Sequence, residues 1–172
     1  TMAGAEKNIS APHMIATLLH HLEIRNGQHF LLIGSKGGYL AAILDQLLGI
    51  NGIVTIIEPH NEVLEHTIDT LEKYNSKGII RVLSASSMDY FEDFEKPVDR
   101  VLITGAIREI PEFLEVILQD GAFVLGPFGG TIQQRLLKRE KNSNQWLDTD
   151  LGGVVFGPMD TFSAERNPLD PY

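Results

Sequence analysis

The stretch His29-Phe30-Leu31-Leu32-Ile33-Gly34-Ser35-Lys36-Gly37-Gly38-Tyr39 decides the fold of this chain. Its first five residues form a short apolar run, which is typical of a strand buried on both faces. A glycine-rich turn follows, and residues 39–48 then show helical apolar spacing. A strand that leads through such a turn directly into a helix predicts the first unit of an α/β fold.

The alternation of strand and helix continues on both sides of this stretch. Upstream, Ser10 and Pro12 predict the start of a helix that ends near Gly27. Downstream, we predict strands at 53–57, 79–83, 101–104 and 122–125, and helices at 61–74 and 110–118. Apolar strands that alternate with helices indicate a doubly wound, mostly parallel sheet with right-handed crossovers.

The pattern changes after Gly126-Pro127-Phe128-Gly129-Gly130. Residues 131–141 and 154–156 are predicted to be the last strands, and we expect them to form an antiparallel pair. A polar loop rich in Asn and Asp is expected between them, and residues 160–172 are expected to be irregular. With residues 1–9 as a leader, the chain is predicted to be a single domain over 1–172.

Composition and charge narrow the classes of function. Fourteen Lys and Arg stand against 23 Asp and Glu, which gives a net charge of −9. A negative field repels nucleic acid and anionic membranes, and no apolar run approaches the roughly 20 residues of a membrane span. The chain has no cysteine, which excludes disulfides, thiolate zinc sites and cysteine nucleophiles. We expect a soluble, cytoplasmic protein that binds neither nucleic acid nor membrane.

A candidate ligand site lies where the predicted parallel strands end. The turn Gly34-Ser35-Lys36-Gly37-Gly38 lets a ligand approach the backbone at the start of a helix. Glu58 ends the next strand, 58 − 38 = 20 residues after the last glycine, which is the place of an acid that accepts both ribose hydroxyls. Together they favour an adenosine ligand. The alternatives are a tight turn alone and a solvated acid that caps the next helix.

Other candidates carry a weaker signal. Ser87 and Asp89 follow the third predicted strand and could hydrogen-bond a base edge, or could belong to a serine-rich loop with a helix cap. The histidines are scattered and form no H-E-x-x-H motif, so we expect no metal site. No G-x-S-x-G motif is present, which disfavours a serine hydrolase of the α/β type.

Segments along nearly the whole chain resemble one known family. They are Ile9-Ser10-Ala11-Pro12-His13-Met14, residues 34–39, Ile57-Glu58, residues 97–104, Ile110-Pro111, residues 120–130, Gln133 and residues 155–159. In this order, from about residue 8 to residue 159, they are similar to the protein-L-isoaspartate O-methyltransferases. The segment I-S-A-P-H-M is the most specific of them.

The resemblance implies a Rossmann-like domain of the class I methyltransferase type. It implies that the chain binds S-adenosylmethionine and methylates the free carboxylate of isoaspartyl residues in damaged proteins. The family's active-site serine falls on Ser10, its cofactor turn on residues 34–38 and its ribose acid on Glu58. The substrate carboxylate is already ionised at pH 7, so positioning and exclusion of water suffice, with Ser10 orienting the carboxyl group.

Two departures from the family pattern concern the cofactor. Where the family has an acid before the turn and a glycine within it, this chain has Leu32 and Lys36. Lys36 could clash with the methionine moiety or pair with its carboxylate. The family's adenine-reading G-D-G falls on Ser86-Ser87-Met88, and Asp89 comes two positions late.

A third departure concerns the substrate. Only nine residues precede Ser10, so we expect the family's N-terminal substrate lid to be largely absent. Truncation, or a second copy or partner protein that supplies the missing wall, would account for this. The alternative function is a degenerate methyltransferase-fold module that binds a nucleoside or a protein without turnover. A methyltransferase with another substrate, or a nicotinamide or flavin enzyme, also remains open.

Overall fold

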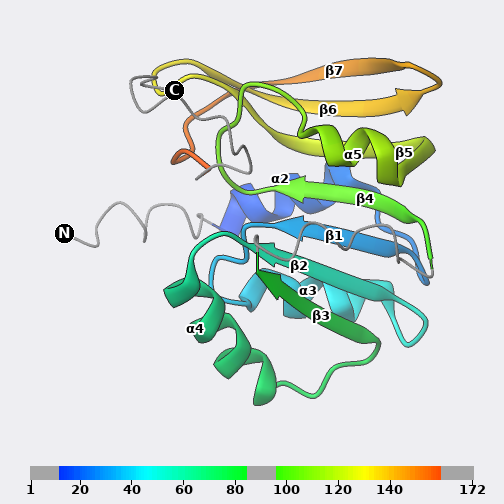
Figure 1. The fold of residues 1–172 in the computed structure, drawn as a ribbon, viewed down its shortest axis with the longest axis vertical. Helices are drawn as coiled ribbons and strands as arrows, with labels where there is room; N and C mark the ends of the chain where they lie inside the picture. Colours follow the sequence, from blue (N-terminus) through cyan, green and yellow to red (C-terminus); the bar gives the residue numbers. More distant parts are fainter. Residues whose placement is uncertain (1–11, 85–95, 160–172) are drawn as a thin grey trace.

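The structure is a computed structural model that describes residues 12–84 and 96–159. Its helices are α2 (Pro12–Leu22), α3 (Tyr39–Leu48), α4 (Asn61–Glu72) and α5 (Glu112–Ile117). Its strands are β1 (His29–Ile33), β2 (Ile53–Glu58), β3 (Ile79–Ser84), β4 (Val98–Ile103), β5 (Leu118–Gly129), β6 (Gln134–Asn142) and β7 (Gln145–Val154), as Figure 1 shows.

The strands form one sheet in the order β3-β2-β1-β4-β5-β6-β7. The strands from β1 to β5 pair in parallel, whereas β6 is antiparallel to both β5 and β7. This confirms the predicted fold class, including the antiparallel strands at the C-terminal end. Because β1 lies between β2 and β4, the strand order reverses at the carboxyl end of β1, where open α/β sheets bind ligands.

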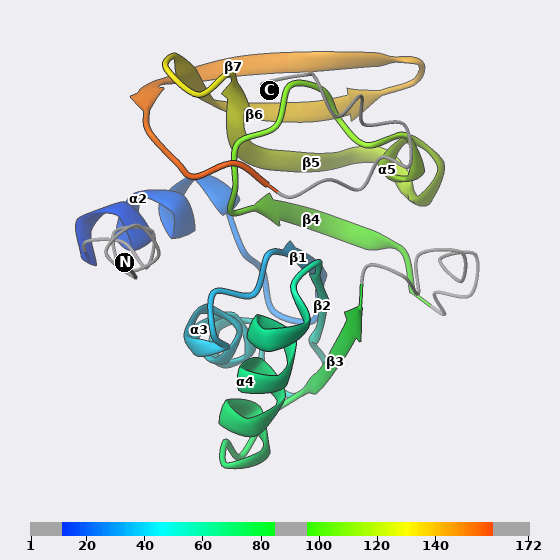
Figure 2. The same cartoon turned by 60° about the vertical axis from the view of Figure 1, so that its left-hand side comes forward.

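Strand β1 is buried along its whole length, as its apolar run predicts. Phe30 and Leu32 belong to one core cluster, with side chains of α2 and α3. Leu31 and Ile33 belong to a second cluster, with side chains of α5. Successive side chains of a strand point to opposite faces, so helices must cover both faces of the sheet, which Figure 2 shows for α2 and α3 against α5.

Buried polar contacts fix the parts of this frame. The Nε of Arg100 on β4 donates to the Leu22 carbonyl at the end of α2 (2.9 Å), and its guanidinium lies 4.1 Å from the centre of the Phe123 ring. Asp45 of α3 is buried and accepts three donors of the segment that leads to β3. These donors are the Tyr74 hydroxyl and the backbone N–H groups of Lys77 and Gly78.

His29, at the start of β1, is buried between β2 and the segment before β4. Its Nδ1 lies 2.7 Å from the Lys96 carbonyl and its Nε2 lies 2.8 Å from the Thr55 hydroxyl. A carbonyl only accepts, so Nδ1 carries the proton and Nε2 accepts from Thr55. Burial lowers the pKa of His29 below its usual value.

The prediction of a polar loop between the last two strands is wrong. Ser143 and Asn144 alone separate β6 from β7, which takes up residues 145–154 instead of starting at residue 154. Ion pairs of Arg135 with Asp150 (2.9 Å) and of Arg139 with Asp148 (2.8 Å) connect the two strands. The polar residues that indicated a loop are therefore cross-strand partners on the exposed faces of an edge hairpin.

Several predicted boundaries also move. Strand β5 covers residues 118–129, a longer range than the predicted 122–125, and α5 is shorter than the predicted 110–118. Strand β4 begins at Val98, three residues before the predicted start, and α4 ends two residues before the predicted end. No helix among the described residues is long and apolar enough to span a membrane.

Candidate active site

The turn between β1 and α3 has a left-handed backbone at four of its five residues. The φ angles are 89° at Gly34, 49° at Lys36, 88° at Gly37 and 93° at Gly38. Gly34 is also sterically required, since a Cβ atom there would lie 2.2 Å from the Thr104 Oγ1. The glycines therefore set the path of the turn, and Lys36 adopts a conformation that most side chains avoid.

Thr104 and the end of the described chain hold the other side of this turn. The Thr104 hydroxyl lies 2.9 Å from the Gly34 carbonyl and 3.2 Å from the Ile33 carbonyl, both of which it can reach as a donor. Residues 157–159, which we call the closing segment, return to the loop after β4. The Ala106 N–H donates to the carbonyl of Gly157 (2.8 Å), and the Met159 N–H donates to the carbonyl of Ala106 (3.0 Å).

Glu58 is joined to the glycine turn by direct hydrogen bonds. Its Oε1 accepts the Ser35 N–H (3.0 Å) and the Ser35 hydroxyl (2.9 Å), and its Oε2 accepts the His60 N–H (3.0 Å). The Ser35 hydroxyl also lies 2.7 Å from the Thr67 hydroxyl. The Thr67 hydroxyl donates its own proton to the Val63 carbonyl (2.7 Å), so in its contact with Thr67 the Ser35 hydroxyl is the donor, and it shares its proton between Thr67 and the carboxylate. Ser35 thus contacts both α4, through Thr67, and the acid that ends β2, through Glu58.

The carboxylate is buried but keeps some capacity to accept. Glu58 is 4% exposed, so the alternative of a solvated acid is wrong, although its bond to His60 does hold the backbone just before α4. A carboxylate offers about four lone-pair positions, and three of these are used here. The remaining acceptor position is on Oε2.

Three predicted site residues, Ser10, Ser87 and Asp89, lie outside the described residues. The structure brings the others together, since Gly34, Ser35, Lys36, Gly37 and Gly38 form one turn against Glu58. Thr67 and Thr104 are not among the predicted site residues. They come from distant elements, although Thr104 ends the family-like segment 97–104. The start of α2, two residues after Ser10, lies on the side of the carboxyl ends of β1 and β4 in Figures 1 and 2.

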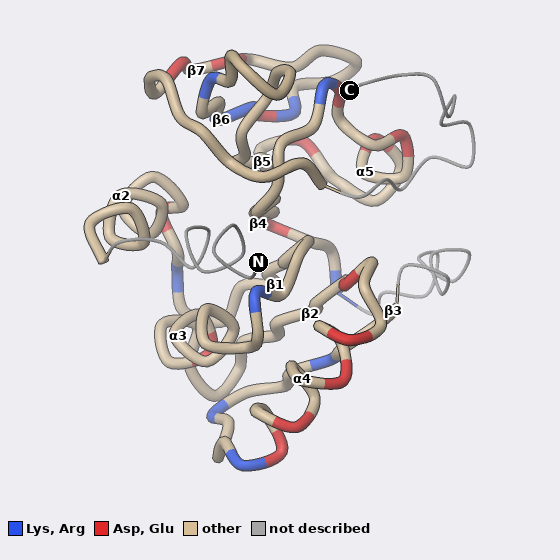
Figure 3. The backbone as a smooth tube through the Cα atoms, turned by 90° about the vertical axis from the view of Figure 1, so that its left-hand side faces the viewer, with Lys and Arg blue, Asp and Glu red and all other residues tan. Residues whose placement is uncertain are grey.

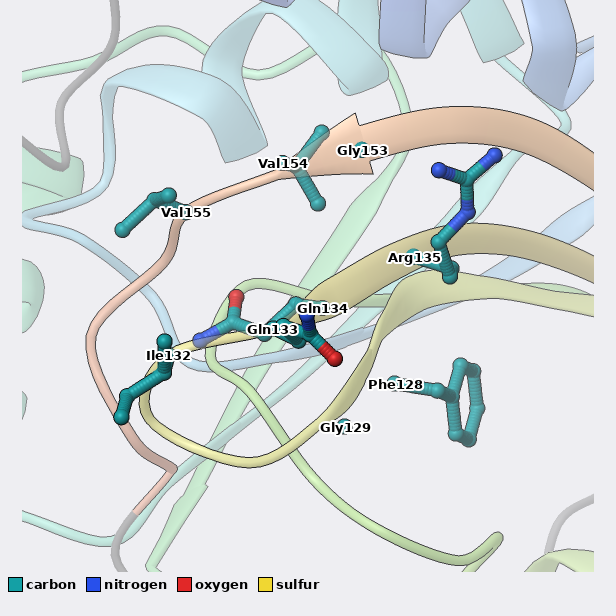
Figure 4. A pocket seen from close by; sticks show the side chains of 9 residues that line it. All are labelled: Phe128, Gly129, Ile132, Gln133, Gln134, Arg135, Gly153, Val154 and Val155. Atoms are coloured by element: carbon teal, nitrogen blue, oxygen red, sulfur yellow. The ribbon is translucent and has the colours of Figure 1, made fainter.

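An open groove of about 810 Å³ lies farther along the same edge of the sheet (Figure 4). It is lined by Phe128, Gly129, Ile132, Gln133, Gln134, Arg135, Gly153, Val154 and Val155. Ile132 and Val155 are strongly exposed and lie at one end of the groove, opposite Phe128. None of the predicted site residues that the structure describes lines it. Among the described residues, no group of His, Asp and Glu is arranged to hold a metal ion.

Comparison with known proteins agrees with this geometry. A sequence profile described as "Protein-L-isoaspartate(D-aspartate) O-methyltransferase" matches residues 1–162. The chain belongs to the protein-L-isoaspartate O-methyltransferase family. A protein-L-isoaspartate O-methyltransferase of Methanocella arvoryzae is 33% identical over 91% of this chain and 81% of its own length. One of Methanococcus maripaludis is 30% identical over 91% of this chain and 72% of its own length.

Solved structures of the family share the fold. A protein-L-isoaspartate O-methyltransferase superposes with a TM-score of 0.76 at 20% identity over 89% of this chain, which spans 48% of that longer chain. A Plasmodium falciparum structure described as belonging to this family, in complex with S-adenosyl-L-homocysteine, gives 0.67 at 20% identity over 88% of this chain and 75% of its own. At this identity the structures support the fold of the family.

One departure from the family pattern has a clear structural outcome. Leu32, which stands where the family resemblance places an acid, is fully buried in the core cluster formed with α2 and α3. Its side chain contributes to packing and leaves no carboxylate at this place. The charged side chains beside the turn after β1 are therefore those of Lys36, in the turn, and Glu58, at the end of β2.

Proposed function

We propose that this member of the protein-L-isoaspartate O-methyltransferase family transfers a methyl group from S-adenosylmethionine to the free carboxylate of isoaspartyl residues. One observation carries the proposal. A glycine turn and a buried strand-end acid are hydrogen-bonded to each other at the point where the strand order reverses. This is the place and the pair of features with which an open α/β sheet binds an adenosine ligand.

The residues present fit this cofactor. Glu58 Oε2 would accept a ribose hydroxyl, while the Ser35 and His60 N–H groups hold the carboxylate in its orientation. Gly34 leaves no Cβ between the turn and Thr104, and α3 begins without a side-chain cap, so its first N–H groups face the ligand side. S-Adenosylmethionine, when bound, supplies an electrophilic methyl group on a sulfonium centre.

The chain's own residues then have to position the substrate and exclude water. A carboxylate is ionised at neutral pH, so this reaction needs no general base. We assign to Ser10 a hydrogen bond that orients the substrate carboxyl group, because Ser10 lies two residues before α2. Met159, at the end of the closing segment, packs against Gly34 and Gly105, and in this position it would limit the access of water to the glycine turn.

The first test combines titration calorimetry with a methylation assay. Wild type should bind S-adenosylhomocysteine and methylate an isoaspartyl peptide, but not the same peptide with a normal aspartyl residue. Glu58→Gln should weaken the binding of S-adenosylhomocysteine about tenfold or more, the effect of a hydrogen bond to a charged group. Glu62→Gln, a change of an exposed acid in the first turn of α4, is the matched control and should leave the affinity unchanged.

Ser10→Ala separates binding from transfer. It should lower the rate of peptide methylation and leave the affinity for S-adenosylhomocysteine at the wild-type value. Cofactor binding by the wild type with no methylation of any isoaspartyl peptide would instead support the degenerate alternative. No binding at millimolar S-adenosylhomocysteine would contradict the proposed function itself.

The proposal has two further parts. The first is a cytoplasmic location, which the absence of cysteine suits. The second is a wall of the substrate site that comes from a second copy or another protein. Light scattering after size-exclusion chromatography, with and without an isoaspartyl peptide, measures whether the chain associates with itself.

A further inference from the structure

Lys36 occupies a conformation that a lysine adopts only at a cost. Its φ of 49° lies in the left-handed region, between glycines that also have positive φ. A residue with a Cβ loses roughly 1–2 kcal/mol there. A glycine would fit without strain, so the lysine side chain itself needs a reason, and strained residues at ligand turns are often functional.

The ammonium group of Lys36 has no counter-ion among the described residues. The side chain is partly buried, and burial lowers the pKa of its ammonium group, an effect that the charge of Glu58 partly offsets. Glu58 nevertheless forms its hydrogen bonds with Ser35 and His60, and the structure gives Lys36 no hydrogen bond or ion pair with another described residue.

The other acids near the turn do not replace this counter-ion. Glu62, Glu65, Asp69 and Glu72 lie along α4 and are exposed to solvent, as the red segments of α4 in Figure 3 show. The helix that follows the turn, α3, begins at Tyr39 without a side-chain cap, and its first backbone N–H groups add positive potential. The turn therefore attracts an anionic group.

The orientation of the ligand says which anionic group this is. With its ribose on Glu58, the 5′ substituent of an adenosine ligand extends toward the glycine turn. In S-adenosylmethionine this substituent ends in an ammonium and a carboxylate group. Leu32 is buried in the core and offers the ammonium group no partner.

We propose that Lys36 is a specificity-determining residue that binds the carboxylate of the methionine half of S-adenosylmethionine. This inference rests on the proposed function, since it assigns a role within the same site. It makes the carboxylate, and not the ammonium group, the part of the amino-acid moiety that this turn recognises.

The test compares two ligands that differ only in this carboxylate. Titration calorimetry measures S-adenosylmethionine and decarboxylated S-adenosylmethionine on wild type, Lys36→Met and Lys36→Arg. We expect wild type to prefer the carboxylated ligand about ten- to a hundredfold, the range for a hydrogen bond between charged groups. Lys36→Met should reduce this preference to within about threefold, by weakening only the carboxylated ligand, and Lys36→Arg should retain most of it.

Two further variants separate the charge of Lys36 from the shape of the turn and from the overall charge of the protein. Lys36→Gly suits the positive φ, so it should fold at least as well as wild type and lose the preference as Lys36→Met does. Lys73→Met removes an exposed positive charge at the end of α4 and should leave the preference intact. As pH rises through the lowered pKa of Lys36, the preference of the wild type should decline, and that of Lys36→Met should not change.

Three results would overturn the inference. Equal weakening of both ligands in Lys36→Met would mean that Lys36 only shapes the turn. Tighter binding of S-adenosylmethionine by Lys36→Gly would mean that the lysine obstructs the ligand. Binding of neither ligand by the wild type would refute the proposed function and this inference with it, whereas the first two results leave the proposed function standing.

Discussion

Substitution of Gly34 by alanine tests the packing of the candidate site against a nearly ideal control. Gly34 and Gly121 have almost the same φ, 89° and 90°. A Cβ at Gly34 would lie 2.2 Å from the Thr104 Oγ1 and 3.0 Å from the Met159 Cε, whereas a Cβ at Gly121 would meet nothing within 4 Å. The two substitutions therefore share the backbone strain and differ in the steric clash.

The structure sets the expected size of this difference. Left-handed strain destabilises an alanine by roughly 1–2 kcal/mol, and the lower entropy of the unfolded chain offsets about 0.4–1 kcal/mol of this. Gly121→Ala should thus lose about 1 kcal/mol. Gly34→Ala should lose a further 1–3 kcal/mol or so from overpacking, because Thr104 has to move away from the carbonyl groups that it contacts.

Urea unfolding followed by the fluorescence of Trp146, the single tryptophan, measures both losses. With a slope near 2 kcal/mol per molar urea, the two midpoints should differ by about 0.5–1.5 M. Thr104→Ala removes the atom that clashes, so Gly34→Ala should cost less in that background, with a coupling of about 1–2 kcal/mol. Equal losses at Gly34 and Gly121, or no coupling to Thr104, would refute this account of the turn.

Three further predictions concern the frame of the site. Below pH 6.5 the unfolded chain binds more protons than the folded chain at His29, because the pKa of His29 is lowered in the folded state. As the pH is lowered from 7 to 5, the free energy of unfolding should therefore decrease more in wild type than in His29→Gln, and urea titrations at each pH measure this. Asp45→Ala should lose about 2–4 kcal/mol, since it leaves three donors without their acceptor; the exposed Asp69→Ala should lose less than about 0.5 kcal/mol, and equal urea midpoints would contradict the role of Asp45. Arg100→Met removes the hydrogen bond to the Leu22 carbonyl at the end of α2, the helix that follows Ser10. It should therefore reduce the rate of peptide methylation more than the affinity for S-adenosylhomocysteine. An unchanged rate would mean that the position of α2 does not depend on this bond.

The central part of the fold could be predicted from the sequence because its signals are local. The buried run of β1 and the glycines after it specify a strand, a turn and a helix within twenty residues. Strand β7 could not be predicted in this way. Its Asp148 and Asp150 have low strand propensity, and they join the sheet because β6 presents Arg139 and Arg135 to them.

The candidate site shows the same division. Glu58 could be placed from its spacing to the turn, because both lie at the carboxyl ends of neighbouring strands. The contacts of Ser35 with Thr67 and Glu58 could not be predicted, since they depend on how α4 packs against the turn. The contact of Thr104 with Gly34 joins residues 70 positions apart, and only the pairing of β1 with β4 brings them together.

The closing segment has a consequence for the order in which the protein acquires its site during synthesis. The glycine turn and Glu58 leave the ribosome early, but the loop after β4 is held by residues 157–159, which are made about a hundred residues later. A nascent chain that has reached β4 can pair β1 with its neighbours, yet the backbone partners of Ala106 are still missing. The backbone contacts of Ala106 are therefore among the last parts of the site to form, and a chain that stops before Gly157 would have its turn and its acid in place beside a loop that only the bonds of Ile107 to β5 hold.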